Sequence, residues 1–290
     1  MSDLKQVTIV SGKGGTGKTT AVASFAALAQ EKVIADCDVD AANLYLLMHP
    51  EDHEQGEFIG AKIAVRDEEK CIRCGECERR CRFGAITVEE VDELACEGCG
   101  LCVLTCPAHA LTLEPAIVGT WYVGESRYGP MAHARLLPAA ESSGKLVTLV
   151  RQKAENLAYE HDCGLVLIDG PPGLGCTTTS ALADVDLAVI VTEPTLSGMH
   201  DMARLVELIG HFGLPAAAII NKADINADNT AELRRQCGAW DMPLLGEIPW
   251  DPTVTDALAA QMPLVEHNDG PAATGMCAAW EQAEQLIGGL

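Results

Sequence analysis

A glycine-rich segment near the start of the chain constrains the fold more than any other feature. Residues 12–19 read Gly-Lys-Gly-Gly-Thr-Gly-Lys-Thr and lie between an apolar run at residues 7–10 and a helical pattern that begins at Thr19. This order satisfies the pattern Gly-x4-Gly-Lys-Ser/Thr in the strand–loop–helix context of a phosphate-binding loop. Glycines let backbone N–H groups turn inward around phosphate oxygens at the start of a helix. The segment therefore predicts a nucleotide site at the edge of an α/β sheet.

The side chains of this loop have distinct expected roles. Lys18 neutralises the β- and γ-phosphate oxygens, and the Thr19 hydroxyl can ligate Mg²⁺. A chance glycine-rich turn is the alternative, but the pattern and its context agree. The expected nucleotide-binding residues of the loop are Gly12, Lys13, Gly14, Gly15, Thr16, Gly17, Lys18, Thr19 and Thr20.

Acidic residues follow two further apolar runs, where strands are expected to end. Asp36, Asp38 and Asp40 come directly after residues 33–35, and Asp169 precedes the sequence Gly-Pro-Pro-Gly. An acid at such a strand end beside a phosphate loop is typical of a Mg²⁺ site, so Asp169 is expected to hold the ion through water. The turn after it suits a loop that moves when the γ-phosphate leaves. For the cluster that starts at Asp36, a helix cap or a turn is the alternative.

Two sets of periodic segments define the expected fold. The expected strands are residues 7–10, 33–35, 165–168, 187–191, 216–220 and 244–248. The expected helices are residues 19–30, 147–161, 198–212, 229–237 and 272–287. Strands this apolar, joined by helical crossovers, predict an α/β fold with a doubly wound, mostly parallel sheet covered on both faces.

A smaller unit interrupts this pattern after the second expected strand. We expect residues 1–60 and 115–290 to form the main domain and residues 61–114 to form an inserted domain. Residues 119–145 are rich in Gly, Pro and Ser, and they are expected to return the chain to the main domain. The strand content of this return segment is left open.

The inserted segment contains two matching cysteine runs. Thirteen cysteines in a chain expected to be cytoplasmic are not expected to form disulfides, because that compartment keeps thiols reduced. Residues 71–88 and 96–113 repeat with an offset of 25 residues, and each run has the spacing Cys-x2-Cys-x2-Cys-x3-Cys. This is the bacterial ferredoxin spacing for 4Fe-4S clusters, in which the fourth cysteine ligates the other cluster. Tetrahedral zinc is the rival for Cys-x2-Cys pairs, but two runs of four favour clusters.

The spacing assigns four ligands to each cluster. The first cluster is expected to take Cys71, Cys74, Cys77 and Cys106, and the second Cys81, Cys96, Cys99 and Cys102. Arg82 stands where the pattern has a proline after the fourth cysteine, which leaves the ligand count unchanged. Residues 70–82 carry five cations against two acids, whereas residues 83–99 carry five acids and no cation. This difference predicts a higher reduction potential for the first cluster.

Charge and hydropathy narrow the classes of function. The chain has 20 Lys and Arg against 42 Asp and Glu, a formal net charge of −22, which argues against non-specific nucleic-acid binding. No Lys or Arg follows Arg235, so no basic helix is expected to dock on anionic lipid there. The sequence shows neither a membrane-spanning apolar run nor a secretory signal. We therefore expect a cytoplasmic protein bound neither to nucleic acid nor to a membrane.

Nearly the whole chain resembles the MinD/ParA/Mrp superfamily of P-loop ATPases, in the form that contains an inserted ferredoxin domain. The resemblance rests on residues 13–20, 36–40 and 166–173 and on the two cysteine runs. It implies a deviant Walker A loop and an ATP-sandwiched dimer. In that dimer Lys13 would reach the partner's nucleotide, although an exposed loop lysine is the alternative. The resemblance also implies that Asp38 positions the attacking water.

Further residues match the pattern of this superfamily. Asn221 lies in an Asn-Lys-Ala-Asp segment similar to its base-reading loop and would hydrogen-bond the purine, and Pro249 would line the other side. Trp250 either joins this site or is an ordinary packed aromatic. His133 and Lys145 are either switch-coupled contacts or exposed loop positions.

Five cysteines lie outside the two runs, and none of them forms a Cys-x2-Cys pair. The superfamily's iron-sulfur carrier branch uses such a pair for a cluster that bridges two subunits, so this bridge is not expected here. The five are instead expected to be buried small hydrophobic residues. They are Cys37, Cys163, Cys176, Cys237 and Cys277.

Three functions are compatible with these features. The leading hypothesis is an ATP-gated redox protein with two 4Fe-4S clusters, in which Mg·ATP closes a homodimer, or a heterodimer with a paralogue. Lys13, Lys18 and Asp38 would be catalytic, and the switch segments would control electron passage to a redox or metal-cofactor protein. The alternative is an iron-sulfur or metal-cofactor assembly and carrier ATPase. A spatial-positioning ATPase of the MinD or ParA kind is the third, and its membrane or DNA anchor is missing from this acidic chain.

Overall fold

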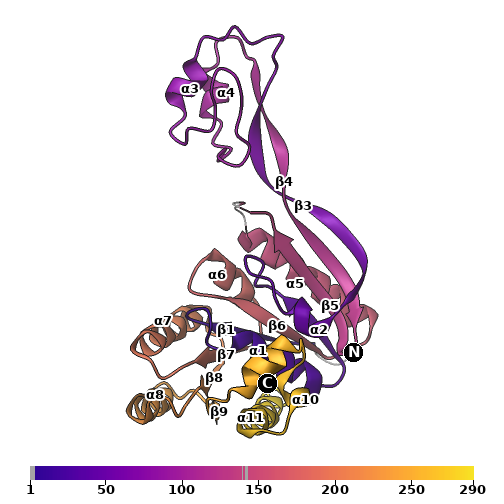
Figure 1. The fold of residues 1–290 in the computed structure, drawn as a ribbon, viewed down its shortest axis with the longest axis vertical. Helices are drawn as coiled ribbons and strands as arrows, with labels where there is room; N and C mark the ends of the chain where they lie inside the picture. Colours follow the sequence, from indigo (N-terminus) through magenta and orange to yellow (C-terminus); the bar gives the residue numbers. More distant parts are fainter. Residues whose placement is uncertain (1–3, 139, 141–142) are drawn as a thin grey trace.

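The protein consists of an α/β body and a small unit held away from it. The structure is a computed structural model that describes residues 4–138, 140 and 143–290. Figure 1 shows a long two-stranded ribbon that rises from the body, with α3 and α4 at its far end. Two expectations extend beyond the described residues, namely the start of the main domain at residue 1 and part of the return segment 119–145.

Within the described residues, nine strands form one sheet with the order β3-β4-β5-β2-β6-β1-β7-β8-β9. The pairs β3–β4 and β4–β5 are antiparallel and the other six pairs are parallel. The strands are β1 (Lys5–Ser11), β2 (Lys32–Asp36), β3 (Glu51–Arg66), β4 (Leu111–Ser126), β5 (Gly129–Leu136), β6 (Leu165–Pro172), β7 (Leu187–Thr192), β8 (Ala216–Asn221) and β9 (Leu244–Ile248). All six expected strands are present, and the mostly parallel sheet is confirmed.

Helices cover both faces of the sheet (Figure 1). They are α1 (Lys18–Leu28), α2 (Tyr45–Met48), α3 (Glu76–Arg80), α4 (Leu101–Thr105), α5 (Ser143–Glu160), α6 (Cys176–Leu182), α7 (Leu196–Phe212), α8 (Ala227–Ala239), α9 (Thr253–Ala259), α10 (Leu264–His267) and α11 (Pro271–Ile287). The five expected helices are confirmed. Among the described residues, no helix combines the length and apolar character needed to cross a bilayer.

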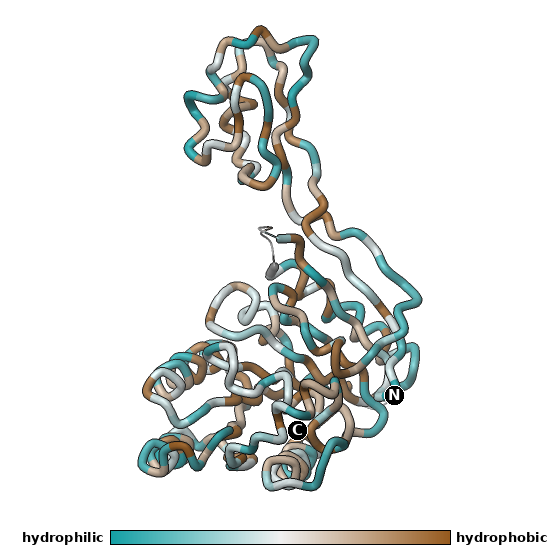
Figure 2. The backbone as a smooth tube through the Cα atoms, in the orientation of Figure 1, coloured by the Kyte–Doolittle hydropathy of each residue, from teal (hydrophilic) through white to brown (hydrophobic). Residues whose placement is uncertain are grey.

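Alternating strand residues build a separate core on each face. In β6, Leu167 joins the cluster formed with α1 and α11, whereas Val166 and Ile168 join the cluster formed with α5. A third cluster packs α7 and α8 against β7 and β8. The brown, hydrophobic positions in Figure 2 gather in the body of the molecule. The doubly wound architecture is therefore confirmed for the body.

The ribbon is formed by β3 and β4, which are 16 residues long each. Its register runs from Glu51 opposite Glu125 at the foot to Arg66 opposite Leu111 at the far end. The second half of β4 also pairs with β5, so the foot of the ribbon belongs to the main sheet. The sequence pattern did not predict these strands, because β3 is polar and largely exposed and lacks clean alternation. The expectation of an insertion after the second strand is wrong, since the small unit follows β3.

The unit at the far end repeats its own backbone. Helices α3 and α4 have five residues each and follow Gly75 and Gly100, whose φ angles are 74° and 75°. Left-handed φ also recurs at Arg73 and Gly98. Glycine adopts this region without strain, and three of these four positions are glycines, Arg73 being the exception. The repeat in the sequence is therefore also a repeat in the structure.

Candidate nucleotide site and cysteine-lined cavities

The glycine-rich loop connects β1 to α1 and lies over a buried charged cluster. Lys18 Nζ lies 2.5 Å from a carboxylate oxygen of Asp169 and 3.5 Å from one of Asp38. The Thr19 hydroxyl donates a hydrogen bond to the other Asp169 oxygen at 2.9 Å. Asp36, the last residue of β2, and Asp169 of β6 are register partners, so two neighbouring strands bring these acids together. The structure thus places the expected phosphate and Mg²⁺ residues at one point.

Burial and neighbouring charges set the protonation of this cluster. Burial raises the pKa of Asp36 well above its ordinary value, and the negative charge of Asp169 adds to this effect. Burial opposes the charge of Lys18, but the Asp169 and Asp38 carboxylates outweigh it and keep the pKa of Lys18 above its usual value. Asp36 accepts hydrogen bonds from the backbone N–H groups of Asp38 and Leu44, each at 3.2 Å. Asp36 therefore shapes the turn after β2, while Lys18 remains a cation for phosphate.

A cavity of about 720 Å³ opens beside the loop, a volume within the range of small-ligand sites. Its loop end is polar, and its other end is lined by side chains such as Leu46, Val254 and Leu258. This arrangement suits a molecule with a phosphate end and a flat apolar end. The expected residues that line it are Gly14, Gly15, Gly17, Lys18, Thr19, Thr20, Asp38, Asn221 and Pro249.

Three expected loop residues do not line this cavity. Gly12 packs against α7, where a Cβ atom would lie 2.2 Å from the Cβ of Asp201. The hydroxyl of Thr16 is buried and has no partner among the described residues. The side chain of Lys13 contacts Glu193 instead of the cavity. Gly12 is therefore required by packing, whereas Thr16 offers a buried polar group inside the loop.

Two residues whose roles were left open are exposed. Trp250 is 56% exposed and lines the cavity, so it is not an ordinary packed aromatic. Its backbone N–H donates to Asp224, which fixes the segment after β9 against the segment after β8. Lys145 is exposed at the start of α5 and lines a second large cavity together with Cys96 and ribbon residues. Lys145 therefore faces the region between the body and the small unit.

Two residues at and just after the end of β8 donate hydrogen bonds to the phosphate loop. Asn221 Nδ2 donates to the Thr16 carbonyl at 2.7 Å, and Lys222 Nζ donates to the Gly15 carbonyl at 3.0 Å. Gly17 has a φ of 97°, and a Cβ atom there would lie 2.2 Å from Asn221 Nδ2. This approach requires glycine. The purine contact expected of Asn221 stays a prediction.

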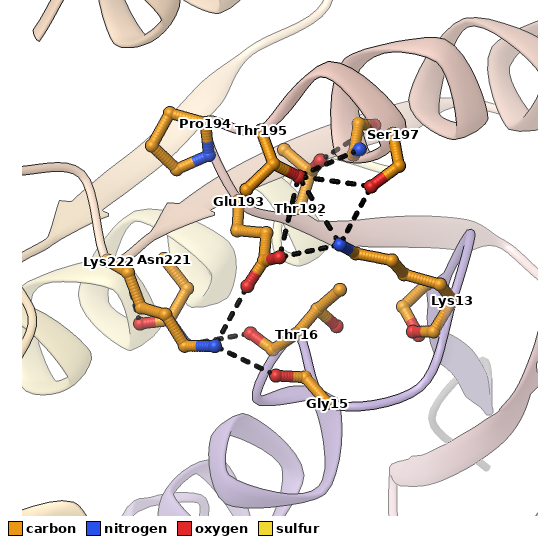
Figure 3. A network of polar contacts seen from close by, with 12 residues as sticks. Lys13, Gly15, Thr16, Thr192, Glu193, Pro194, Thr195, Ser197, Asn221 and Lys222 are labelled. Carbon is orange, nitrogen blue, oxygen red and sulfur yellow. Dashed lines mark hydrogen bonds and ion pairs between the residues drawn. The ribbon is translucent and has the colours of Figure 1, made fainter. Parts of the chain in front are cut away.

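A second charged network holds Lys13 against its own chain (Figure 3). Lys13 Nζ lies 2.6 Å from Glu193 and donates to the hydroxyls of Ser197 at 2.9 Å and Thr195 at 3.3 Å. Lys222 contacts the other Glu193 oxygen at 2.8 Å. Burial opposes ionisation of Glu193, but the two lysines outweigh it and hold its pKa below the usual value. Glu193 has no role that the sequence assigns, although its Glu193-Pro194-Thr195 segment matches the superfamily's pattern.

Two cavities in the small unit are each surrounded by four cysteines. The first cavity is lined by Cys71, Cys74, Cys77 and Cys106, and the second cavity by Cys81, Cys96, Cys99 and Cys102. These sets coincide with the two that the spacing predicts, including the exchange of the fourth cysteine. Across the described residues, no three His, Cys, Asp or Glu side chains are placed to hold one metal ion.

Backbone amides complete these cavities. The N–H of Ala110 donates to Cys106 Sγ at 3.3 Å, and that of Ala64 donates to Cys96 Sγ at 3.4 Å. Such hydrogen bonds favour the thiolate form of a ligand. Gly98 lets β3 approach closely, because a Cβ atom there would lie 2.2 Å from the Lys62 carbonyl oxygen. Thiols on short loops with amide donors fit the ligand chemistry of 4Fe-4S clusters.

The five cysteines outside the runs differ in burial. Cys37 and Cys237 are buried as expected, and burial raises the pKa of both thiols, that of Cys237 to about 11. Cys163 and Cys277 are only half-buried, and Cys176 is exposed. The expectation of burial is wrong for these three. Cys163 follows α5, Cys277 lies within α11 and Cys176 is the first residue of α6.

His133 is buried in β5, so of its two alternatives the exposed loop position is wrong. Its side chain is 1% exposed, and Nε2 lies 2.9 Å from an Asp52 oxygen in β3. Its ring stacks on Tyr122 of β4 and Tyr45 of α2, with centroids 4.9 and 6.0 Å apart. The Arg135 guanidinium covers the same two tyrosine rings. The foot of the ribbon is thereby packed against the segment that follows the nucleotide-site acids.

Comparisons with known proteins agree with the fold and the loop. Residues 7–264 match the family described as the CobQ/CobB/MinD/ParA nucleotide binding domain. Uncharacterized protein MJ0578 of Methanocaldococcus jannaschii is 35% identical over 269 residues, which cover 91% of each chain. An iron-sulfur cluster carrier protein of Pyrococcus horikoshii is 30% identical over 139 residues, 43% of this chain and 45% of the relative.

Solved structures show the same architecture. The septum site-determining protein MinD of Pyrococcus horikoshii, complexed with Mg-ADP, superposes with a TM-score of 0.63 at 18% identity and 98% coverage of each chain. Identity this low shows a common fold alone. The family match spans most of the chain, including the phosphate loop, the strand-end acids and the Asn221 segment. The chain therefore belongs to the CobQ/CobB/MinD/ParA family of P-loop nucleotide-binding proteins.

Proposed function

We propose that the protein is an ATP-hydrolysing iron-sulfur protein in which the nucleotide state controls electron transfer through two 4Fe-4S clusters, or the docking of a redox partner. The packing at the foot of the ribbon carries this proposal. His133 pairs through its backbone with Asp36 of the nucleotide site, and its ring contacts Asp52 and Tyr122 of the ribbon. Tyr45, in the helix after the nucleotide segment, stacks on the same ring. One packed cluster thus links the nucleotide site to the foot of the ribbon that carries the cluster half.

The nucleotide half has the groups that ATP hydrolysis requires. Phosphates would lie in the loop against Lys18, and Thr19 and Asp169 would hold Mg²⁺, which supplies further positive charge. Asp38 lies at the mouth of the loop, 3.5 Å from Lys18 Nζ, and would position the attacking water. Asn221 and Pro249 would flank the purine at the far end of the cavity.

Hydrolysis in this proposal needs a second copy of the chain, or a paralogue. Lys13 would leave Glu193 and reach the nucleotide of the partner, where its charge stabilises the transition state. The side chain of Lys13 is 32% exposed, and an ion pair that is partly open to water is worth about 0–1 kcal/mol. Contacts made when the dimer forms can therefore compensate for the loss of this ion pair.

The cluster half comprises residues 61–114, and residues 1–60 and 115–290 form the ATPase domain. The first cavity would hold one 4Fe-4S cluster and the second cavity the other, which together supply reversible one-electron storage. The chain contributes the thiolates, the amide donors to sulfur and a hydrogen-bonded ribbon that fixes the unit to the main sheet. A protein that exchanges electrons with these clusters is the expected partner.

The proposal is tested by an anaerobic redox titration of the purified chain, followed by electron paramagnetic resonance. The titration is run without nucleotide, with Mg·ATP and with Mg·ADP. Cluster potentials that differ between nucleotide states are expected, and a shift of about 59 mV corresponds to a tenfold coupling, about 1.4 kcal/mol. Protein that contains no iron would overturn the proposal. If the cluster potentials are the same in all nucleotide states, ATP would control only the docking of a partner.

An assembly or carrier ATPase is the second candidate, and the exposure of two ligand thiols favours it. Cys74 and Cys99, one in each cavity, are exposed and could be reached by an acceptor protein. The partial similarity to iron-sulfur cluster carrier proteins points in the same direction. A loaded protein that transfers its clusters to an apo-ferredoxin within minutes, faster with Mg·ATP, would support this candidate. Clusters that stay bound would support the redox function.

A further inference from the structure

Arg66 is a buried cation at the edge of the first cavity. Its side chain is 3% exposed, and it lines this cavity together with the four cysteines. Its terminal nitrogens donate to the carbonyls of Thr87 and Val88. Its Nε is buried and has no hydrogen-bond partner in the described part of the chain. Arg66 also forms an ion pair with Glu68, whose carboxylate lies 3.7 Å away on a side chain that is 59% exposed.

Among the residues that the structure describes, the second cavity has no comparable cation. At its edge β3 contributes Ala64, two residues before Arg66, and the described lining includes Glu97 but no lysine or arginine. The two cavities have matching sets of four cysteines, and each has one amide donor to sulfur, so this buried charge is a clear difference between them. The repeat in the sequence does not reveal it, because Arg66 lies before the first cysteine run.

The cations of residues 70–82 act more weakly on the first cavity. All five are exposed, so solvent and salt screen them. Lys70 is paired with Asp67, and Arg79 and Arg80 are paired with Glu76. Arg66 is therefore the least screened positive charge beside either cavity.

We propose that Arg66 makes the cluster in the first cavity the more easily reduced of the two, so that the first electron taken up by the protein resides there. This inference rests on the proposed function, since it requires both clusters. Reduction adds one electron from an external donor and increases the negative charge on the cluster. A buried guanidinium stabilises that charge more than an exposed one, because the surroundings have a low dielectric constant. Arginine stays a cation throughout, so no proton moves to or from Arg66.

The experiment is an anaerobic potentiometric titration of the full chain, with sodium dithionite as the electron donor. Arg66→Met is expected to shift the reduction equilibrium of the first cluster at least tenfold toward the oxidised form, which is about 59 mV, and to leave the second unchanged. Arg66→Lys keeps a buried charge and is expected to retain most of the potential. Arg73→Met is the matched control, because Arg73 lines the same cavity but is exposed. Cys102→Ser identifies the signal of the second cluster.

High salt distinguishes the effect of the buried charge on the cluster potentials from the effect of the exposed charges. The difference between the two potentials in the wild type is expected to persist at about 0.5 M NaCl, where exposed charges are screened over a few ångströms. An Arg66→Met protein that keeps both clusters with unchanged potentials would overturn the inference. If that variant loses a cluster, the wild type provides the test. A difference between its two cluster potentials that disappears at high salt would then overturn the inference. Wild-type protein without iron would refute the proposed function, not the role of Arg66 alone.

Discussion

Asp36 and His133 are register partners on the adjacent parallel strands β2 and β5. Asp36 pairs in turn with Asp169 on β6, and His133 pairs with Tyr122 on β4. Four residues on four neighbouring strands thus form a row from the proposed Mg²⁺ site to the ribbon. In the proposed function, the hydrogen bonds between these strands would transmit a shift of the segments after Asp36 or Asp169 along this row to the foot of the ribbon.

The first prediction is that His133→Ala uncouples the two halves. The variant loses the contact with Asp52 and the stacking on both tyrosines, but it changes no group that contacts phosphate. We expect Mg·ATP affinity to stay within about twofold, while the nucleotide-dependent shift of the cluster potentials falls by at least about half. His211→Ala, an exposed position on α7, is the control. Nucleotide-dependent shifts of equal size in both variants would exclude His133 from the coupling.

The second prediction concerns acid. Burial lowers the pKa of His133 below its ordinary value, and the Asp52 carboxylate offsets only part of that effect. Below the unfolded-state pKa of about 6.5, the unfolded chain therefore binds more protons than the folded one. Stability should fall as the pH drops from about 6.5 toward the folded pKa, with a slope of up to about 1.4 kcal/mol per pH unit from this residue.

Urea unfolding followed by tryptophan fluorescence between about pH 5 and 7.5 measures this effect. His133→Gln removes the titrating group, so the slope between pH 5 and 6.5 should be smaller in the variant than in the wild type. The other histidines are common to both proteins and cancel in the comparison. Equal slopes would show that His133 is protonated in the folded protein at the same pH as in the unfolded chain.

The parts of the structure that the sequence predicts are those with a local signal. Lys18 and Thr19 have fixed places after a strand in the phosphate-loop pattern, and Asp169 ends an apolar run. The exchange of Cys81 and Cys106 between the two cavities follows from the ferredoxin spacing alone. In each case a short motif fixes a backbone geometry, and that geometry places the side chain.

The remaining features depend on contacts between distant segments. His133 and Asp52 are 81 residues apart, and they meet because the polar strand β3 pairs with β4, which no apolar pattern indicates. Lys13 and Glu193 likewise lie far apart in the sequence, and they meet because the neighbouring strands β1 and β7 end beside each other. Arg66 is an ordinary strand residue in the sequence, and its burial depends on how the loop with Thr87 folds over it.

The third prediction is that Glu193 restrains Lys13 before the dimer forms. Glu193→Gln removes one charge that holds Lys13 in its own chain, a contact worth about 1 kcal/mol or less. We expect ATP turnover to rise, by about fivefold at most. Lys13→Ala should lower turnover by about 10³-fold or more and leave ATP binding intact, since its role is in the transition state. Glu247→Gln, which breaks an exposed pair with Arg234, is the control.

Phosphate release measured over a range of protein concentrations distinguishes the two roles. A lysine that acts across a dimer gives turnover per chain that rises with concentration and then saturates. Lys13→Ala protein that hydrolyses ATP at the wild-type rate would contradict the proposed role. A Glu193→Gln protein with reduced turnover would show that its contact with Lys222, which braces the loop, matters more than its hold on Lys13.

The fourth prediction tests the exchange of ligands between the runs. Cys106 belongs to the second run but lines the first cavity, so Cys106→Ala should remove the cluster of the first cavity. Iron per chain should fall by about half, because four of eight iron atoms are lost. The remaining signal should be the one whose potential Arg66→Met leaves unchanged. Cys176→Ala, an exposed thiol outside the runs, should keep both clusters. If Cys106→Ala instead removes the signal that Cys102→Ser alters, each run holds its own cluster and the assignment is reversed.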